Sequence, residues 1–248
     1  MRIAVVGATG RIGGLATAAL ERDGHEVVRI SRSTGVDVRT GDGLDAALDG
    51  VDAVIDSTNT SSNDPAEILD FFGSATRTLL AAEHRAGVQH HVLLSIVGID
   101  HGQPVPHYAG KREQERQVVA GPVPWSIVRA TQFHDFAAMT AGWAEADGVA
   151  TVAPMLVQPI APADVAEVLA DIATGQPLLD RLDVAGPETQ DLVDMARRTY
   201  EARGRTMRLV PSWRGIFGTD MAGEVLLPGN GARITSTTFD DWLAAGAQ

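Results

Sequence analysis

The 248-residue chain contains no cysteine. This absence excludes disulfide bonds, thiolate metal sites and a cysteine nucleophile, and it agrees with a reducing compartment. The sequence also has no run of basic residues, and its formal net charge is −12. Nucleic acids and anionic membrane surfaces bind clustered Lys and Arg, so neither is an expected partner.

Long apolar runs are missing as well. No stretch reaches transmembrane length, and the apolar run at residues 3–6 is broken by Gly7 before it is long enough for a signal peptide. No internal repeat is visible, and no His, Asp and Glu residues have the spacing of metal ligands. We therefore expect a cytoplasmic protein, a monomer or homodimer, that acts on a small-molecule substrate and holds no metal.

Apolar residues make up 44% of the chain, which predicts a packed globular protein. Segments typical of strands and helices alternate, as in a parallel sheet covered by helices on both faces. The expected strands are residues 3–6, 26–30, 36–38, 53–55, 91–95, 125–130 and 182–184. The expected helices begin with residues 15–20 and 44–48 and continue with 65–86, 109–120, 162–174, 191–203 and about 239–243.

The predicted fold class is therefore α/β, a Rossmann-type doubly wound parallel sheet with a small C-terminal substrate-side lobe. Residues 1–150 are expected to form the core of this fold. Residues 151–248 add segments to this core and form the lobe, within one structural unit. The alternation of strands and helices weakens after residue 130, which is why the second half is less regular.

A glycine-rich turn stands between the first strand and the first helix, with Gly7, Gly10 and Gly13 in the pattern GxxGxxG. Gly7 permits a tight exit from the strand, and Gly10 lets a phosphate approach the backbone. Gly13 lets the helix pack closely on the sheet. Free N–H groups and the positive end of the helix dipole then face an anion, which predicts a site for a nucleotide pyrophosphate.

The end of the second strand predicts NADP in preference to NAD. In this fold an acidic residue at that place binds the ribose 2′-hydroxyl, but residues 29–33 contain no carboxylate. Arg32 instead offers a planar set of donors for a 2′-phosphate, flanked by Ser31 and Ser33. Arg11 adds a second positive charge, and Asp37 can accept a hydrogen bond from adenine. A solvated basic loop and a surface aspartate are the alternatives.

Several segments resemble those of atypical short-chain dehydrogenase/reductases, most closely the NmrA-like NAD(P)H-binding branch. They are residues 7–13, 31–32, 44–54, 95–98, 108–111, 115, 125–133 and 238–243. The resemblance implies a Rossmann fold, NADP(H), and either a reductase or a redox-sensing protein. Some relatives in this branch reduce quinones or similar electrophiles, and others are regulators.

The resemblance also implies a catalytic set, a serine at the end of the fifth strand and a Tyr-x-x-x-Lys helix. Ser95 and Lys111 match the serine and the lysine. Four residues before Lys111, however, stands His107, and Tyr108 is only three before it. Either side chain is a candidate proton donor, and Tyr108 requires an irregular start of the helix. Pocket lining is the alternative role for both.

The expected site falls into two sets. The catalytic candidates are Ser95, Lys111, Tyr108 and His107. The cofactor-binding candidates are Gly7, Thr9, Gly10, Arg11, Ile12, Gly13, Ser31, Arg32, Ser33, Asp37, Val38, Ser57, Thr58, Asn59, Ser95, Lys111, Ala130, Thr131, Gln132 and Phe133. Ala130 ends the sixth strand, and the three residues after it are expected to border the nicotinamide.

Three functions are compatible with these residues. The first is an NADPH-dependent reductase of a small quinone-like or conjugated carbonyl acceptor. The second is an NADP(H)-sensing regulatory protein without turnover, which the displaced tyrosine favours. The third is an epimerase or dehydratase, although such enzymes normally keep the tyrosine and have a larger C-terminal lobe.

Overall fold

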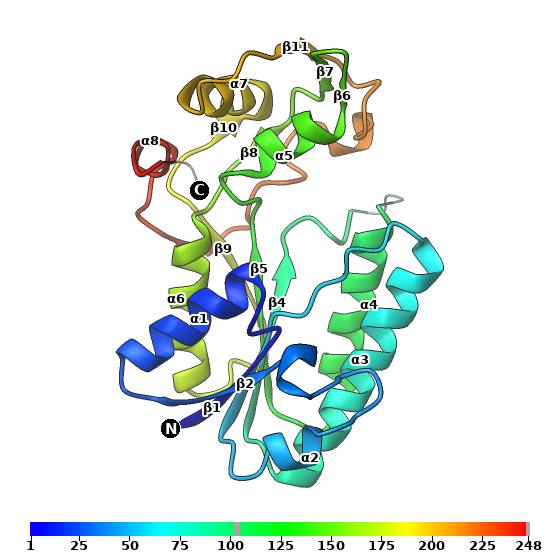
Figure 1. The fold of residues 1–248 in the computed structure, drawn as a ribbon, viewed down its shortest axis with the longest axis vertical. Coiled ribbons are helices and arrows are strands. Elements are labelled where there is room, and N and C mark those ends of the chain that lie inside the picture. The colour runs from blue at the N-terminus through cyan, green and yellow to red at the C-terminus, as the bar shows by residue number, and fades with distance from the viewer. Residues whose placement is uncertain (102–104, 247–248) are drawn as a thin grey trace. The chain divides into compact units, whose positions relative to one another are not determined.

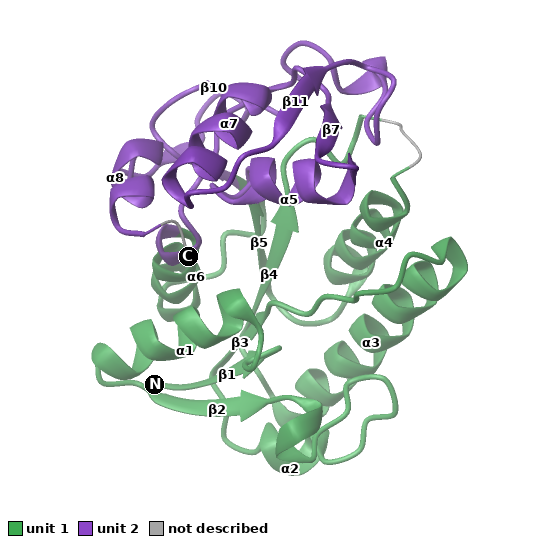
Figure 2. Ribbon diagram, turned by 45° about the horizontal axis from the view of Figure 1, so that its top comes forward, with its two compact units in different colours: residues 1–129, 165–182 green, residues 130–164, 183–248 purple. Residues whose placement is uncertain are grey.

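A computed structural model describes residues 1–101 and 105–246 (Figure 1). The chain forms two compact units, coloured separately in Figure 2. Unit 1 contains residues 1–129 and 165–182, and unit 2 contains residues 130–164 and 183–248. The domain boundary expected near residue 150 falls inside unit 2, and it stays a prediction about how the chain divides into folding domains.

Parallel strands make up the main sheet. Its order is β12-β9-β5-β4-β3-β1-β2. The strands are β1 (Arg2–Val6), β2 (Glu26–Ile30), β3 (Ala53–Asp56), β4 (His90–Ile96), β5 (Trp125–Ala130), β9 (Arg181–Ala185) and β12 (Arg233–Ile234). β1 pairs in parallel with β2 on one side and β3 on the other, and β12 pairs in parallel with β9. The predicted fold class, a Rossmann-type α/β protein, is confirmed.

Helices cover both faces of this sheet in unit 1. α1 (Arg11–Arg22) and α6 (Pro162–Thr174) lie on one face, and α3 (Pro65–Ala86) and α4 (Pro106–Ala120) lie on the other (Figure 1). The strands are apolar on both faces because both are covered, and residues 3–6 of β1 are fully buried. The core on the side of α3 joins Val6, Val54, Leu79, Leu93 and Ile127.

Local signals set the ends of the helices. α3 spans the predicted residues because Asp64 caps its first turn, accepting hydrogen bonds from the N–H groups of Ala66 (2.8 Å) and Glu67 (3.0 Å). Gly87, at φ +75°, ends the helix in the left-handed region. α4 starts three residues earlier than expected, at Pro106.

The strand expected at residues 36–38 is wrong. This segment follows a 3₁₀ turn, η1 (Arg32–Thr34), and a left-handed Gly35 at φ +82°. Val36 is buried in the same apolar cluster as Leu44 of the short helix α2 (Leu44–Ala47). The backbone N–H groups of Val36 and Asp37 bond carbonyls in the same loop and do not pair with a strand. The apolar residues of 36–38 therefore belong to a loop that is anchored in the core.

A buried acid and a buried base meet between α3 and β4. Nδ1 of His91 lies 2.9 Å from Oε1 of Glu83, and both side chains are completely buried. Burial raises the pKa of Glu83 above its usual range. Burial lowers the pKa of His91, but the adjoining carboxylate reverses this effect, and the pKa is raised overall.

Unit 2 consists of short elements. Besides β12 and the end of β9, they are α5 (Phe136–Trp143), β6 (Glu145–Ala146), β7 (Val149–Val152), β8 (Leu156–Val157), β10 (Gln190–Asp191), α7 (Leu192–Ala202), β11 (Arg208–Pro211), a 3₁₀ turn (Thr219–Met221) and α8 (Phe239–Ala244). β6, β7 and β11 form one small sheet, and β8 pairs with β10. Thr238 and Asp241 form a capping box at the start of α8. Phe239 and Trp242 of this helix pack against the ring of His134.

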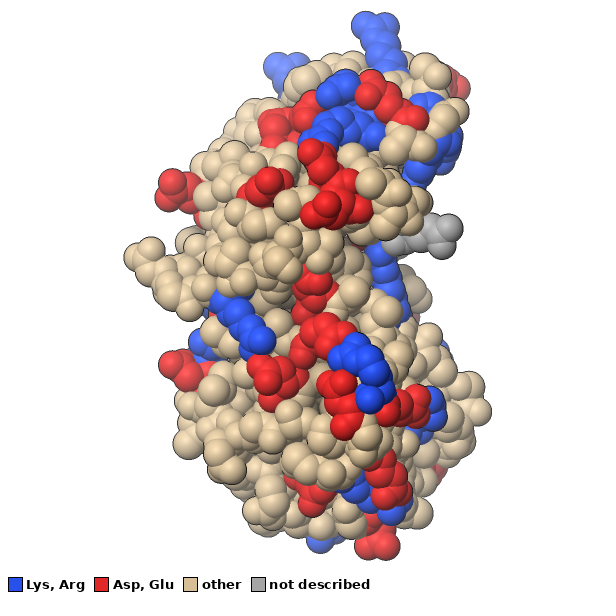
Figure 3. All heavy atoms as spheres, turned by 90° about the vertical axis from the view of Figure 1, so that its left-hand side faces the viewer, with Lys and Arg blue, Asp and Glu red and all other residues tan. Residues whose placement is uncertain are grey.

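Charged side chains of both signs are mixed on the face drawn in Figure 3. Ion pairs on the surface include Arg22 with Glu167 and Arg197 with Asp194, both at 2.7 Å. Within residues 1–101 and 105–246, no helix combines the length and the apolar composition needed to cross a lipid bilayer.

Candidate cofactor and active site

The glycine turn leaves β1 as the sequence predicts. Gly7 has φ +79° and donates its N–H to the Ile30 carbonyl of β2 at 3.0 Å. Gly10 donates its N–H to the Gly7 carbonyl at 2.8 Å and is the N-cap of α1. A residue with a Cβ atom is strained at the φ of Gly7, so glycine is required there.

Gly13 lets α1 approach this turn closely. A Cβ atom built on Gly13 would lie 2.2 Å from the Gly7 carbonyl oxygen and 2.8 Å from Oγ of Ser57. At the next residue, Gly14, the nearest atom would be the Ala8 carbonyl oxygen at 3.6 Å, an ordinary contact. The close packing therefore depends on Gly13 and does not depend on Gly14.

The N-terminus of α1 has the properties of an anion site. No acidic residue lies in its first turn, and Thr9, Gly10 and Arg11 are exposed. The N–H groups of a first helical turn have no partner within the helix, and the helix dipole places positive charge there. The turn and this helix end together fit a pyrophosphate, as residues 7–13 predict.

The end of β2 presents an unengaged guanidinium. Arg29 is paired with Glu21 at 2.7 Å, whereas Arg32 is exposed and has no ion-pair partner in the part of the chain that the structure describes. The hydroxyl groups of Ser31 and Ser33 lie 2.8 Å apart beside it. This grouping of donors fits a phosphate monoester.

The remaining cofactor candidates of unit 1 have structural partners of their own. Asp37 accepts a hydrogen bond from the N–H of Arg39 at 2.8 Å, and both Asp37 and Val38 are half-buried. Ser57 donates its hydroxyl to the Val6 carbonyl at 2.7 Å and so supports the glycine turn. Thr58 is buried and Asn59 is exposed, both directly after β3.

Lys111 is buried, with 5% of its surface exposed. Its ammonium donates to the Leu94 carbonyl at 2.8 Å and to Oε1 of Gln114 at 2.7 Å. It also lies 4.9 Å from the centre of the Phe72 ring. Burial lowers the pKa of Lys111 to about 8, while the carboxylates of Asp56 and Glu115 oppose this change.

Ser95, at the end of β4, belongs to an ionic cluster around the buried Glu115. Its hydroxyl donates to Glu115 at 2.6 Å. The same carboxylate accepts hydrogen bonds from Arg129 at 2.8 and 2.6 Å and from Arg181 at 2.8 Å. Burial raises the pKa of Glu115, but the two guanidinium groups and Ser95 outweigh it, so that the pKa is lowered overall.

A hydrogen-bond network that the sequence did not predict begins at Lys111. Gln114 accepts from this lysine and donates its Nε2–H to Asp56 at 2.9 Å. Asp56 is buried and is the last residue of β3. Asp56 ends a buried strand at the edge of the sheet where ligands bind in such folds. This position could have identified it from the sequence as a candidate site residue. Arg181 has no comparable signal, because only the fold brings it to Glu115.

His107 and Tyr108 lie in the first turn of α4. The ring of His107 packs edge-on against Phe72, with the ring centres 5.3 Å apart. Burial, with a smaller contribution from Lys111, lowers the pKa of His107 to about 4, so the imidazole is neutral at neutral pH. Tyr108 is buried, and its N–H bonds the Val105 carbonyl at 2.9 Å, three residues back. The next N–H, that of Ala109, bonds the same carbonyl at 3.3 Å, so the helix begins regularly and a role for Tyr108 as proton donor stays a prediction.

The four candidates at and after the end of β5 all belong to unit 2. Ala130 is buried, and Thr131 is buried with its hydroxyl bonded to the Gln158 carbonyl at 2.6 Å. Phe133 forms a bridge with Ile160. Gln132 is buried, and neither atom of its amide has a hydrogen-bond partner among the described residues.

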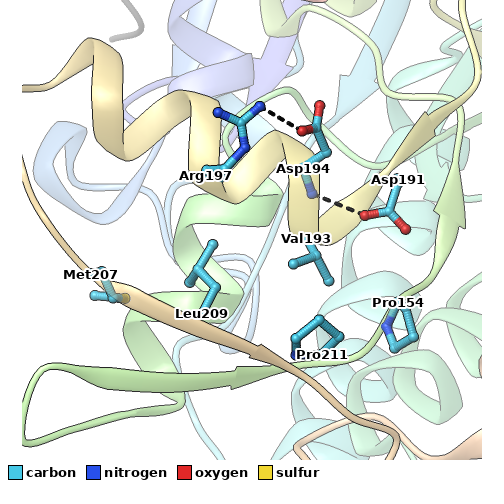
Figure 4. A pocket seen from close by; sticks show the side chains of 8 residues that line it. All are labelled: Pro154, Asp191, Val193, Asp194, Arg197, Met207, Leu209 and Pro211. Atoms are coloured by element: carbon cyan, nitrogen blue, oxygen red, sulfur yellow. Dashed lines mark hydrogen bonds and ion pairs between the residues drawn. The ribbon is translucent and has the colours of Figure 1, made fainter.

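A surface groove of about 430 Å³ lies in unit 2 beside α7 (Figure 4). Its apolar lining includes Val193 and Leu209. Its charged groups are engaged, because Asp191 accepts from the N–H of Asp194 at 2.9 Å and Arg197 pairs with Asp194. The groove therefore offers apolar contact and no free ionisable group among the residues that line it.

Comparison with known proteins agrees with this geometry. A family model described as NAD(P)H-binding matches residues 7–176, more than half of the chain. No curated protein matches this chain. Solved structures with the same fold include a short-chain dehydrogenase/reductase superfamily protein from Agrobacterium tumefaciens with bound NAD, with 18% identity and a TM-score of 0.69, covering 100% of this chain and 96% of that one.

Two further structures illustrate the range of activities on this fold. A nucleoside-diphosphate-sugar epimerase from Staphylococcus aureus has 16% identity and a TM-score of 0.69, covering 98% of this chain and 99% of its own. An NADPH-dependent quinone oxidoreductase from Escherichia coli, complexed with NADPH, has 18% identity and a TM-score of 0.63, covering 85% and 78%. Identities this low establish the shared fold alone. With the family match and the glycine cradle together, the chain is a member of the NAD(P)H-binding family.

Proposed function

We propose that the chain is an NADPH-dependent reductase of small quinone-like or conjugated carbonyl acceptors. The observation that carries this proposal is the internal engagement of the residues that would manage a proton in carbonyl reduction. The Ser95 hydroxyl donates to Glu115, and two of the Lys111 donors go to Leu94 and Gln114. The neutral His107 is a poor general acid at neutral pH.

The acceptor class follows from this shortage of proton donors. Reduction of a simple ketone produces a strongly basic alkoxide, so the reaction benefits from a positioned acid. Reduction of a quinone produces a weakly basic oxyanion that takes its proton from water. Tyr108 remains the candidate donor within the site, and a quinone-like acceptor has the least need of it.

The cofactor side of the proposal assigns the candidate residues to parts of NADPH. The pyrophosphate would be bound by residues 7–13 and the 2′-phosphate by residues 31–33, with Arg32 as the main charge. Asp37 and Val38 would contact the adenine, and Ser57, Thr58 and Asn59 would line the cleft. The nicotinamide half would be oriented by Ser95 and Lys111. When bound, NADPH would supply the hydride.

NADP is proposed over NAD because of the charge at the end of β2. Arg32 has an exposed guanidinium without an ion-pair partner among the described residues, and no carboxylate stands at residues 29–33. A 2′-phosphate would pair with this guanidinium, whereas a 2′-hydroxyl would leave it unused.

The test is NADPH oxidation, followed by absorbance, against a panel of quinones, enones and simple carbonyls, with cofactor binding measured by fluorescence in the same samples. We expect turnover with quinones or enones and little with simple ketones. Turnover with ketones alone would contradict the proposed acceptor class.

The second candidate is an NADP(H)-sensing regulatory protein. The same engagement of Ser95 and Lys111 favours it, because a cofactor-binding protein without a free proton donor need not turn the cofactor over. Tight binding of NADPH without oxidation across the whole panel would support this candidate and would contradict the reductase. The acidic chain would then act through another protein.

A further inference from the structure

Lys111 is the only lysine in the chain, because every other Lys or Arg position holds arginine. Its side chain lies in the interior of unit 1, with 5% of its surface exposed. An ammonium is a compact point charge that can lose its proton, whereas a guanidinium keeps its proton. Burial favours the neutral amine, so an ammonium in this place needs partners that hold it and keep it charged.

Gln114 stands between this ammonium and a buried carboxylate. Its Oε1 accepts from Nζ of Lys111 at 2.7 Å, and its Nε2–H donates to Oδ2 of Asp56 at 2.9 Å. An ammonium only donates and a carboxylate only accepts, so the two charges determine which end of the amide faces each partner. Gln114 is completely buried and Asp56 is 1% exposed. The amide is therefore held between one positive and one negative charge.

Backbone groups hold both ends of this Lys111–Gln114–Asp56 network. The Leu94 carbonyl of β4 accepts a second N–H of Lys111 at 2.8 Å. Oδ1 of Asp56 accepts from the backbone N–H of Thr58 at 2.9 Å, and the Thr58 hydroxyl accepts from Nε2 of Gln114 at 3.3 Å. An ammonium has three N–H groups, so the two internal bonds fix the direction of the third.

We propose that Gln114 and Asp56 are positioning residues for Lys111, an inference that rests on the proposed role of this lysine toward the cofactor. Gln114 sets the place of the ammonium. Asp56 orients Gln114 and keeps the ammonium charged. The third N–H is then the one available to cofactor or substrate. Gln114 follows Lys111 by three residues, so both side chains lie on the same side of α4.

The groups that face Lys111 come from several elements of unit 1. Burial lowers the pKa of Lys111 to about 8, while Asp56 of β3 and Glu115 of α4 oppose this change. Glu115 is already paired with two guanidinium groups. His107 of α4 is neutral at neutral pH, and α3 presents the uncharged ring of Phe72. Asp56 is therefore the carboxylate whose removal tests the network most directly.

Asp56 also acts on the buried pair of Glu83 and His91. Burial has the largest effect on the pKa of both members, and the Asp56 charge adds a smaller increase to each. The pH dependence of stability therefore contains this pair as well as Lys111. A titration that tests the network must be followed on the lysine itself.

The experiment measures the pKa of Lys111 by NMR in a chain made with ¹³C-labelled lysine. Because this is the only lysine, one Cε signal reports the titration. Asp56→Asn removes the charge and keeps an acceptor for Gln114. We expect the midpoint of the lysine titration to fall by about one pH unit in this variant, a loss of proton affinity of about tenfold.

Asp52→Asn is the matched control. Asp52 directly precedes β3 and Asp56 ends it, so the two variants make the same change at opposite ends of one strand. Asp52 is exposed and accepts from the N–H of Arg2 at 2.8 Å. A strand rises about 3.3 Å per residue, which separates the two positions by about 13 Å. The lysine midpoint in Asp52→Asn should equal that of the wild-type chain.

Gln114→Leu tests the positioning and does not change the charge. It removes both hydrogen bonds of the amide, so the lysine midpoint should fall here as well. With a quinone acceptor, kcat should fall about tenfold. The dissociation constant of NADPH should change by less than about threefold, because the proposed phosphate sites lie at residues 7–13 and 31–33. If Asp56→Asn does not fold, the lysine titration of Gln114→Leu decides the test.

Three results would overturn the assignment. The first is a lysine midpoint that is the same in the wild-type chain, Asp56→Asn and Gln114→Leu. The second is an equal fall in Asp56→Asn and Asp52→Asn, which would reflect the net charge of the chain. The third is an unchanged kcat in Gln114→Leu. The NMR titration needs neither cofactor nor turnover, so missing turnover in the wild-type chain, with a midpoint lowered by Asp56→Asn alone, would refute the reductase and support the network.

Discussion

Replacement of Gly13 by alanine tests the cofactor cradle at its closest contact. The added Cβ would lie 2.2 Å from the carbonyl oxygen and 2.7 Å from the carbonyl carbon of Gly7. Both are backbone atoms, so α1 must move away from the turn. Overpacking of this severity costs about 3 kcal/mol, the upper part of the usual range. The better helix propensity of alanine offsets about 1 kcal/mol, which leaves a net loss of about 2 kcal/mol.

Gly14→Ala provides the control on the adjacent residue. Its Cβ would meet only the Ala8 carbonyl oxygen, at 3.6 Å, so the gain in helix propensity is not opposed. We expect this variant to be more stable than the wild-type chain by about 0.5–1 kcal/mol. Gly13→Ala should therefore lower the free energy of unfolding and Gly14→Ala should raise it, with a difference of about 3 kcal/mol between the two variants.

The assay combines thermal unfolding with NADPH titration. A loss of about 2 kcal/mol corresponds to a Tm lower by about 4–8 °C for a chain of this size. Gly13→Ala should also weaken NADPH binding at least tenfold, because moving α1 displaces the N–H groups of its first turn. Equal Tm values and equal dissociation constants for Gly13→Ala and Gly14→Ala would refute the cradle.

Three further predictions concern charge and protons. Arg32→Ala should weaken NADPH about tenfold or more and leave NADH unchanged in direct titrations, and an equal effect on both would refute the phosphate assignment. His91 and Glu83 both have raised pKa values, so the folded chain holds a proton that the unfolded chain releases above pH 6.5. The pair's contribution to the free energy of unfolding should therefore fall as the pH rises above 6.5, by at most about 1.4 kcal/mol per pH unit. In denaturant unfolding, the stability of the wild-type chain should fall more steeply, or rise less, with pH than that of Glu83→Gln, and equal slopes in the two chains would contradict the pair. With an enone acceptor, Tyr108→Phe should lower kcat more than His107→Phe, and identical rates for both variants and the wild-type chain would exclude either side chain as proton donor.

The elements that the sequence predicted correctly are those with local signals. The strand, glycine turn and helix at the N-terminus follow from composition and spacing within 20 residues. α3 follows from an N-cap at Asp64, a proline at Pro65 and a left-handed Gly87. β5 and α6 have the predicted bounds because their apolar patterns are long enough to be specific.

Other features depend on contacts between distant residues and could not be predicted in this way. Several strands of unit 2 have only two residues, too few for a pattern of alternation to appear. The segment 36–38 looks like a strand because the core needs Val36, although its backbone forms turns. The hydrogen-bond partners Glu115 of Ser95 and Leu94 of Lys111 are 20 and 17 residues away in the sequence. The sequence therefore predicts that Ser95 and Lys111 are site candidates, but it does not predict which groups they bond.

Single-turnover reduction is the most direct test of the proposed activity. The chain saturated with NADPH is mixed rapidly with a benzoquinone, and the loss of NADPH absorbance is compared with the rate without protein. We predict a fast phase that slows when the transferred hydrogen at C4 of the nicotinamide is deuterium. A rate equal to the protein-free reaction, for a chain shown to bind NADPH, would contradict the reductase.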